Sequence, residues 1–293
     1  MEVQIENYKI DDKYIRQSLE SFYNLIDDKE EGASDTRYKS WEWCYSAFCE
    51  GREKYKKADE DEKKKIVDYL ALHLAFYLAS WGMYRGSSFL LQRDYKTHIP
   101  AVKILLDEKY DSLVGYVPSD HNLDNDINLI FEKCNGLYDI ISNSYTREND
   151  RGDWEDRPSD TLITKILMGT LGCVPAFDRF LKRGIQWLKQ THKSKFGSLR
   201  QTIENKGTTF SELVKFAVAN KDSLKIENAD IEYPVMKCVD MFFWQIGFEL
   251  DLVDQLKTKS NNLKVKKIAS AIIGSSENEG VETIINAINN RWK

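Results

Sequence analysis

Apolar residues recur at spacings of three and four along most of the chain, which places them on one face of a helix. No stretch alternates apolar and polar residues cleanly, as a half-buried strand would. The clearest helical runs span residues 14–26, 161–172, 209–220, 235–256 and 281–292. The pattern predicts an all-α fold: a compact multi-helix globular protein built from two closely packed helical halves.

One acidic, glycine-containing segment, TRENDRGDWEDRPSD at 146–160, interrupts this pattern. It predicts a loop that separates an N-terminal helical half, 1–145, from a C-terminal half, 161–293. Favoured N-cap residues predict helix starts at Ser159 or Asp160 and at Ser211, and glycines predict helix ends near Gly115 and Gly172.

The composition is that of a globular protein, with 42% hydrophobic and 30% charged residues among 293. The longest apolar run, residues 69–84, contains His73 and is shorter than the about 20 residues that a membrane span requires. The N-terminus has neither a basic start nor an apolar run, so we expect a cytoplasmic protein. The cysteines stand at positions 44, 49, 134, 173 and 238. Their scatter predicts reduced core residues and no metal site, and nothing in the sequence calls for a cofactor.

A second feature is the set of polar residues that occur within the apolar stretch FYLASWGMYRGSSFLLQ at 76–92. If the helix is continuous, its small residues form one stripe, comprising Ala75, Ala79, Gly82 and Gly86. Beside it, a stripe of Trp81, Arg85, Ser88 and Gln92, with Tyr84 nearby, presents groups that can stack on and hydrogen-bond to a planar ligand. The alternative is a helix wedged between others, with Arg85 paired to an acidic residue.

A comparable combination occurs in the run 235–256, where Lys237, Asp240 and Trp244 share one helical face. These three residues are further candidates for substrate binding. The alternative is that Lys237 and Asp240 pair with each other or with Arg85.

The segment SDTLITKILMGTLGCVPAFDRFLKRG at 159–184 predicts a capped helix, a turn containing glycine and proline, and an aspartate that opens the next helix. In this order of features it resembles the helix-hairpin-helix DNA glycosylases. The resemblance implies that Gly172, Pro175 and Asp178 occupy matching places and that Asp178 is the catalytic carboxylate. Asp178 is also a favoured N-cap for the helix that follows it.

The same segment departs from that family. No Leu-Pro-Gly-Val-Gly type hairpin precedes Thr161, and no four-cysteine cluster follows. Lys165 lies 13 residues before Asp178, which is too near to match the family's Schiff-base lysine. The resemblance therefore implies an outlying, monofunctional glycosylase without lyase chemistry.

Charge is distributed unevenly although the net charge is only −5. Eight Lys or Arg residues and one acid lie between Arg179 and Lys206, which predicts a phosphate-binding surface next to Asp178. The candidate DNA-binding residues are Lys182, Arg183, Lys189, Lys193, Lys195 and Arg200. Solvated helix faces would explain the same charges.

Together these features predict a DNA glycosylase that flips a modified or damaged base out of double-stranded DNA and hydrolyses its N-glycosidic bond, leaving an abasic site. In size and helical build the chain is similar to bacterial anti-phage glycosylases that remove a modified cytosine from phage DNA. Two alternatives remain open. One is a ribosyl hydrolase of a free nucleotide; the other is a non-enzymatic interaction or defence-signalling module whose Trp81–Gln92 face binds a protein.

Overall fold

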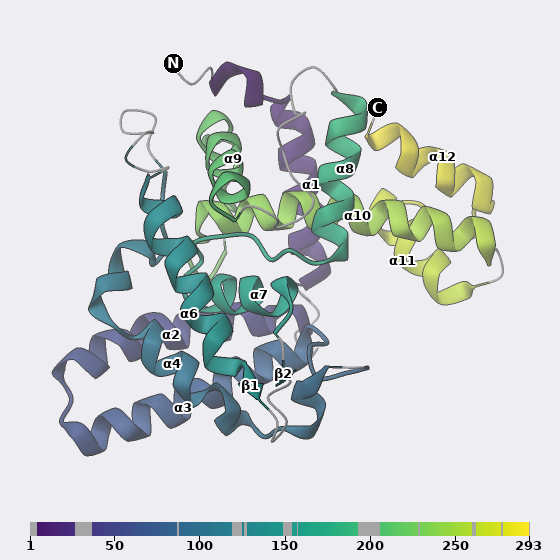
Figure 1. Ribbon diagram of the computed structural model, residues 1–293. Coiled ribbons are helices and arrows are strands. Elements are labelled where there is room, and N and C mark those ends of the chain that lie inside the picture. Colours follow the sequence, from purple (N-terminus) through teal and green to yellow (C-terminus); the bar gives the residue numbers. More distant parts are fainter. Residues whose placement is uncertain are drawn as a thin grey trace.

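The protein is all-helical apart from one pair of very short strands (Figure 1). The computed structural model describes residues 5–26, 37–86, 88–118, 125, 128–148, 154–156, 158–192, 206–227, 229–259, 262–276 and 278–292. The α-helices are α1 (Asp12–Ile26), α2 (Ser40–Lys57), α3 (Glu60–Ser80), α4 (Ile99–Leu105), α6 (Asn135–Tyr145), α7 (Asp160–Thr170), α8 (Arg179–Thr191), α9 (Lys206–Ala219), α10 (Val235–Thr258), α11 (Leu263–Ile273) and α12 (Val281–Arg291).

Tighter helical turns connect several of these helices. The 3-10 helices are η1 (Ile5–Tyr8), η2 (Arg37–Lys39), η3 (Phe89–Gln92), η4 (Tyr95–His98) and η5 (Glu108–Leu113), and η7 (Ile130–Cys134) is a π-helix. The predicted all-α fold is therefore confirmed. Among the described residues, none of the helices is both long and apolar enough to cross a membrane.

Helix α10 is the longest helix and lies at the centre of the molecule (Figure 1). Buried residues occur all round its first four turns, as expected for a helix that is covered on every side. It packs against α1, α8, α9, α11 and α12. Residues far apart in the sequence are thereby brought to one helix.

The crossing of α8 over α10 is close enough for the two backbones to touch. A Cβ atom on Gly184 would lie 2.1 Å from the carbonyl oxygen of Phe243, and one on Gly247 would lie 2.0 Å from that of Phe180. Only glycine fits at these two positions. The crossing therefore fixes the start of α8 relative to the middle of α10.

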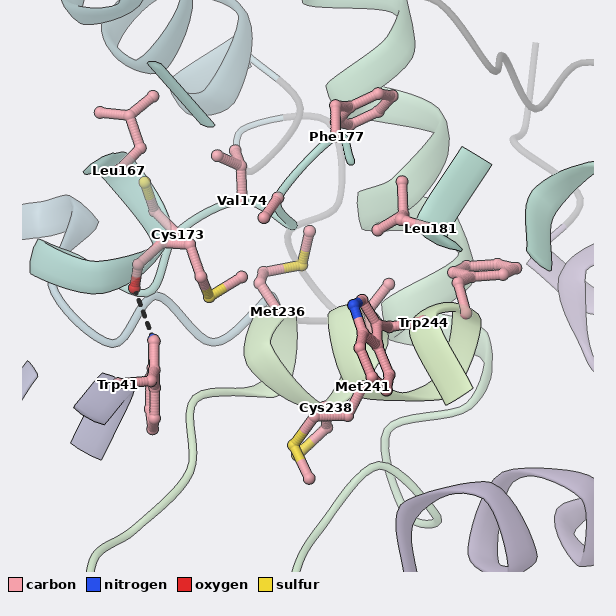
Figure 2. Packing of buried hydrophobic residues seen from close by; sticks show 14 of the residues in the cluster. Trp41, Leu167, Cys173, Val174, Phe177, Leu181, Met236, Cys238, Met241 and Trp244 are labelled. Carbon is pink, nitrogen blue, oxygen red and sulfur yellow. Dashed lines mark hydrogen bonds between the residues drawn. The ribbon is translucent and has the colours of Figure 1, made fainter. Parts of the chain in front are cut away.

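Helix α7 packs against α2, α3 and α6, and the segment that follows it leads into α8. Every residue from Leu162 to Thr170 is buried. The indole of Trp41 in α2 donates a hydrogen bond of 3.1 Å to the carbonyl oxygen of Met168. Figure 2 shows this hydrogen bond and the side chains of α7, the following segment and α10 that pack around it.

Some predicted boundaries are confirmed. The Ser159 hydroxyl accepts from the Leu162 amide and caps α7, and Gly172, at φ +66°, follows its end. Gly115, at φ +58°, follows η5. The start predicted at Ser211 is wrong: α9 begins at Lys206, and Ser211 is buried inside the helix, because the apolar face extends toward the N-terminus through Phe210.

The predicted loop at 146–160 contains a strand pair. Strand β1 (Arg147–Glu148) pairs antiparallel with β2 (Trp154–Asp156). These strands are too short to show an alternating pattern, so no local pattern predicts them. The rest of that segment up to residue 157 lies largely outside the described residues, and the division into halves stays a prediction.

Candidate functional site

The short segment between α7 and α8 carries Asp178 and is held by hydrogen bonds at consecutive residues. The Ala176 amide donates to Asp240 Oδ1 at 2.9 Å. The next amide, of Phe177, donates to the Thr164 hydroxyl at 2.8 Å, and its carbonyl accepts from Thr161 at 2.8 Å. Because α7 and α10 supply these partners, both helices fix the backbone that leads into Asp178.

The carboxylate of Asp178 uses both oxygens. Oδ1 accepts from the amides of Phe180 and Leu181, at 3.0 and 3.1 Å, and so caps α8. Oδ2 lies 3.2 Å from Nζ of Lys165. The predicted capping role is confirmed. Capping is compatible with a chemical role because it orients the carboxylate and places its charge at the positive end of the helix dipole.

Two ion pairs lie against the ring of Trp81. Nζ of Lys165 is 4.6 Å from the ring centroid, and Nζ of Lys237 is 5.3 Å from it. Lys237 in turn pairs with Asp240 at 2.9 Å, and both side chains are buried. The alternative that these two residues pair with each other is therefore what the structure shows, and neither of these candidates for substrate binding is in the lining of the pocket described next.

Asp178 opens onto a pocket of about 250 Å³. Its lining comprises Arg37, Tyr38, Trp81, Gly82, Met83, Arg85, Thr161, Lys165, Asp178, Arg179, Phe180 and Trp244. Four of these residues form an aromatic floor, which we define as Tyr38, Trp81, Trp244 and Phe180. Trp244 lies at its centre, with ring centroids 5.7 Å from Tyr38, 6.1 Å from Trp81 and 5.0 Å from Phe180.

Cations surround this floor. Cζ of Arg37 lies 4.9 Å from the ring centroid of Tyr38, and Cζ of Arg179 lies 4.3 Å from that of Phe180. Arg85 is exposed, and its side chain makes no hydrogen bond or ion pair within the described part of the chain. The pocket therefore combines one carboxylate, an aromatic surface and an excess of positive charge.

The stretch that contains Arg85 is a loop, so the continuous helix on which the two predicted stripes depend does not form. Helix α3 ends at Ser80, and Gly82 and Gly86 have φ angles of +76° and +62°. Glycine in the left-handed conformation ends a helix. The residues after Ser80 therefore do not continue α3, and neither predicted stripe forms. A Cβ on Gly86 would meet nothing within 4 Å, so this glycine of the small-residue stripe is not required by a close packing contact.

The predicted polar stripe consequently divides. Trp81 and Arg85 line the pocket, and Tyr84, Ser88 and Gln92 do not. The Ser88 hydroxyl caps η3 by accepting from the Leu90 amide, and Gln92 is exposed at the end of that turn. Arg85 is exposed on a loop and has no acidic partner among the described residues, so the alternative of a wedged helix with a buried Arg85 pair is wrong as well.

Tyr84 attaches the loop to neighbouring elements through hydrogen bonds. Its hydroxyl lies 2.6 Å from Nε2 of His98, and Nδ1 of His98 lies 2.6 Å from the hydroxyl of Tyr145. Burial lowers the pKa of His98 to about 4 and raises the pKa of Tyr84 to about 12. At neutral pH the chain of three rings is therefore uncharged, and it fixes the loop to η4 and α6.

The predicted DNA-binding residues are only partly described. Lys182 and Arg183 line a second cavity, of about 640 Å³, along one face of α8, and Arg179 lines both cavities. Lys189 lies further along α8 outside this lining. The sequence-predicted residues Lys193, Lys195 and Arg200 lie outside the described residues.

Acidic residues of α10 reduce the positive charge of this surface. Arg183 lies 2.5 Å from Asp254 and 3.7 Å from Asp251, and Arg179 lies 3.3 Å from Asp251. The sequence predicted a more strongly cationic surface because the partner carboxylates stand about 70 positions later in the chain.

Sequence reasoning missed several lining residues. Arg37 and Tyr38 come from η2, far from the motifs in the sequence, and no local pattern marks them. Lys165 did carry a signal, because it is a lone charge among apolar neighbours in the run TLITKILMGT. A charge in such a position requires a partner, and here the partner is Asp178.

Within the described ranges, no group of three or more His, Cys, Asp or Glu side chains is arranged to hold a metal ion. In comparisons with protein-family models, curated proteins and solved structures, no match to this chain was found. The chemistry of the pocket is therefore the basis for any functional conclusion.

Proposed function

We propose that the protein is a DNA glycosylase that hydrolyses the N-glycosidic bond of a flipped nucleotide, with Asp178 as the catalytic carboxylate. The observation that carries this proposal is the position of Asp178 in an aromatic, cation-rimmed pocket of about 250 Å³. A nucleobase is planar and stacks on aromatic rings, and the nucleotide that carries it is anionic.

The chemistry requires a fixed negative charge near the sugar. When the bond between C1′ and the base nitrogen breaks, the base leaves with the electron pair and positive charge develops on the sugar. Asp178 would stabilise that charge. Water then adds its hydroxyl group to C1′ and releases a proton, while the departing base takes up one proton, so the reaction is balanced. The products are the free base and an abasic sugar.

The contacts of Asp178 suit this role because they reduce its freedom before substrate binds. Two amide donors and one ammonium hold the carboxylate, and the segment before it is fixed by Asp240, Thr164 and Thr161. Preorganised charge costs little reorganisation during the reaction, which makes electrostatic stabilisation effective.

The test is incubation of the protein with duplexes that contain normal, damaged or phage-type modified bases, followed by detection of abasic sites. Glucosylated hydroxymethylcytosine belongs in the panel because of the similarity to anti-phage glycosylases. Asp178→Asn should abolish base release. The matched control is Asp59→Asn: Asp59 caps α3 through the amides of Asp61 and Glu62 and lies outside the pocket lining. Base release by Asp178→Asn at the parental rate would reject the proposal.

A second candidate, hydrolysis of a free nucleotide, is favoured by one observation. The arginines along α8 are paired with Asp251 and Asp254, which leaves fewer free cations for a long nucleic acid. Salt separates the two candidates, because binding of a strand through several phosphates falls steeply between low and moderate salt. A free nucleotide makes fewer such contacts and shows a shallower dependence.

A further inference from the structure

We infer that the pocket takes a nucleotide from the interior of a strand, with Arg37 and Arg179 binding the phosphates on its two sides. The inference rests on the proposed function and assigns the residues that bind the phosphates of its substrate. It is drawn from the cationic side chains in the lining of the pocket.

Two arginines of the lining lie against its aromatic side chains. Tyr38 and Phe180 both contact Trp244, with ring centroids 5.7 and 5.0 Å from it. Cζ of Arg37 lies 4.9 Å from the Tyr38 centroid, and Cζ of Arg179 lies 4.3 Å from the Phe180 centroid. A base held in the pocket therefore has two guanidinium groups near it. A nucleotide inside a strand has one phosphate before its sugar and another after it, and so offers an anion to each arginine.

Both guanidinium groups have donors to spare. Arg37 gives one hydrogen bond, to the Tyr38 hydroxyl at 3.1 Å, and has no carboxylate partner within the described residues. Arg179 has a side chain that is 71% exposed and one contact, at 3.3 Å, to Asp251. Each guanidinium carries five N–H donors in a fork that matches phosphate oxygens.

Charge in the lining also favours an anionic ligand. The lining holds four cationic side chains, and its carboxylate, Asp178, is paired with only one of them, Lys165. Arg37, Arg85 and Arg179 remain around the opening. A neutral nucleoside would not neutralise these charges. Two phosphates would pair with Arg37 and Arg179, and the positive charge of Arg85 would attract them as well.

The path of a strand beyond the pocket is also defined. Arg179 lines the pocket and the cavity along α8, where Lys182 and Arg183 follow it. A strand that leaves the pocket past Phe180 therefore meets further donors.

The experiment measures binding of a short duplex with a central tetrahydrofuran abasic analogue, by fluorescence anisotropy across a salt series. Arg37→Gln and Arg179→Gln should each weaken binding and reduce the salt slope by about one unit, because each removes one phosphate contact. Arg16→Gln, an exposed arginine outside the pocket lining, is the matched control and should change neither quantity. Asp251→Asn should tighten binding, because it frees Arg179.

Unchanged affinity and slope in both pocket-arginine variants would overturn the inference. Competition with deoxycytidine 5′-monophosphate provides an independent measurement. If this mononucleotide displaced the duplex when both are present at the same molar concentration, the inference would also be overturned. The probe carries no base at its centre, so the result does not depend on which base is excised. Loss of base release in Asp178→Asn with unaltered binding in both arginine variants would refute the phosphate assignment and leave the proposed function standing.

Discussion

The ammonium of Lys165 lies 3.2 Å from the carboxylate of Asp178 and 4.6 Å from the centre of the Trp81 ring. This ion pair links the interior of α7 to the first turn of α8, and the Lys165 side chain is only 4% exposed. A charge so deeply buried depends on its partner for stability. Asp178 is therefore part of the structure as well as the proposed chemistry.

Asp178→Asn should abolish base release and destabilise the fold by about 3 kcal/mol, because Lys165 is left as an unpaired buried charge. The asparagine still caps α8, so the protein stays folded. Adding Lys165→Met should restore most of the stability without restoring base release. Urea unfolding and abasic-site detection on the parent, the single variant and the double variant check this, and an Asp178→Asn protein as stable as the parent would show that the pair contributes nothing.

Gly184→Ala should destabilise the protein by about 3 kcal/mol or more, because the added methyl is forced against the carbonyl oxygen of Phe243, where backbone cannot move aside easily. Gly136→Ala is the matched control: Gly136 lies in α6 with open space around it, and alanine there should gain about 0.5–1 kcal/mol. Thermal or urea unfolding measures both. Equal effects of the two substitutions would contradict the backbone contact between α8 and α10.

Arg85→Met should leave the melting temperature within a few degrees of the parent, because this arginine is exposed and unpaired in the described structure. It should weaken substrate binding and reduce discrimination between the preferred base and its unmodified parent. Differential scanning fluorimetry and cleavage of matched substrate pairs are the measurements. A large fall in melting temperature would assign Arg85 a structural role instead.

Stability should fall as pH is lowered from 6.5 toward 4, because the pKa of buried His98 drops from 6.5 to about 4 on folding. Between these pH values His98 is protonated in the unfolded chain but stays neutral in the folded protein. The stabilisation is complete above pH 6.5 and is lost by about pH 4, with a total of about 3 kcal/mol at 1.36 kcal/mol per pH unit.

The contribution of His98 is isolated by comparison with His98→Gln, which retains a donor and an acceptor for Tyr84 and Tyr145. Burial also lowers the pKa of His73, so the difference between the two proteins is the relevant quantity. Unfolding free energies measured between pH 6.5 and about 4 should depend less steeply on pH in the variant. Parallel curves would mean that His98 does not titrate differently on folding.

Helices such as α1, α8 and α12 could be predicted from the sequence because burial of one face leaves a periodic pattern that depends only on neighbours in the chain. The position of Asp178 at a helix start could be predicted for the same reason. The helix drawn through Gly82 and Gly86 was wrong, since apolar content alone does not reveal a left-handed glycine. Arg37 and Tyr38 reach the pocket by tertiary packing, which no local pattern records.

The α8–α10 crossing and the Gly82–Gly86 loop give the pocket two walls of different adaptability. One wall, with Asp178, Phe180 and Trp244, cannot shift without separating two backbones in contact. The other carries Arg85 on a loop where Gly86 faces open space. A library randomised at the loop alone would therefore explore new ligands while the carboxylate keeps its place, which makes this fold a practical starting point for redirecting specificity without redesigning the wall that carries Asp178.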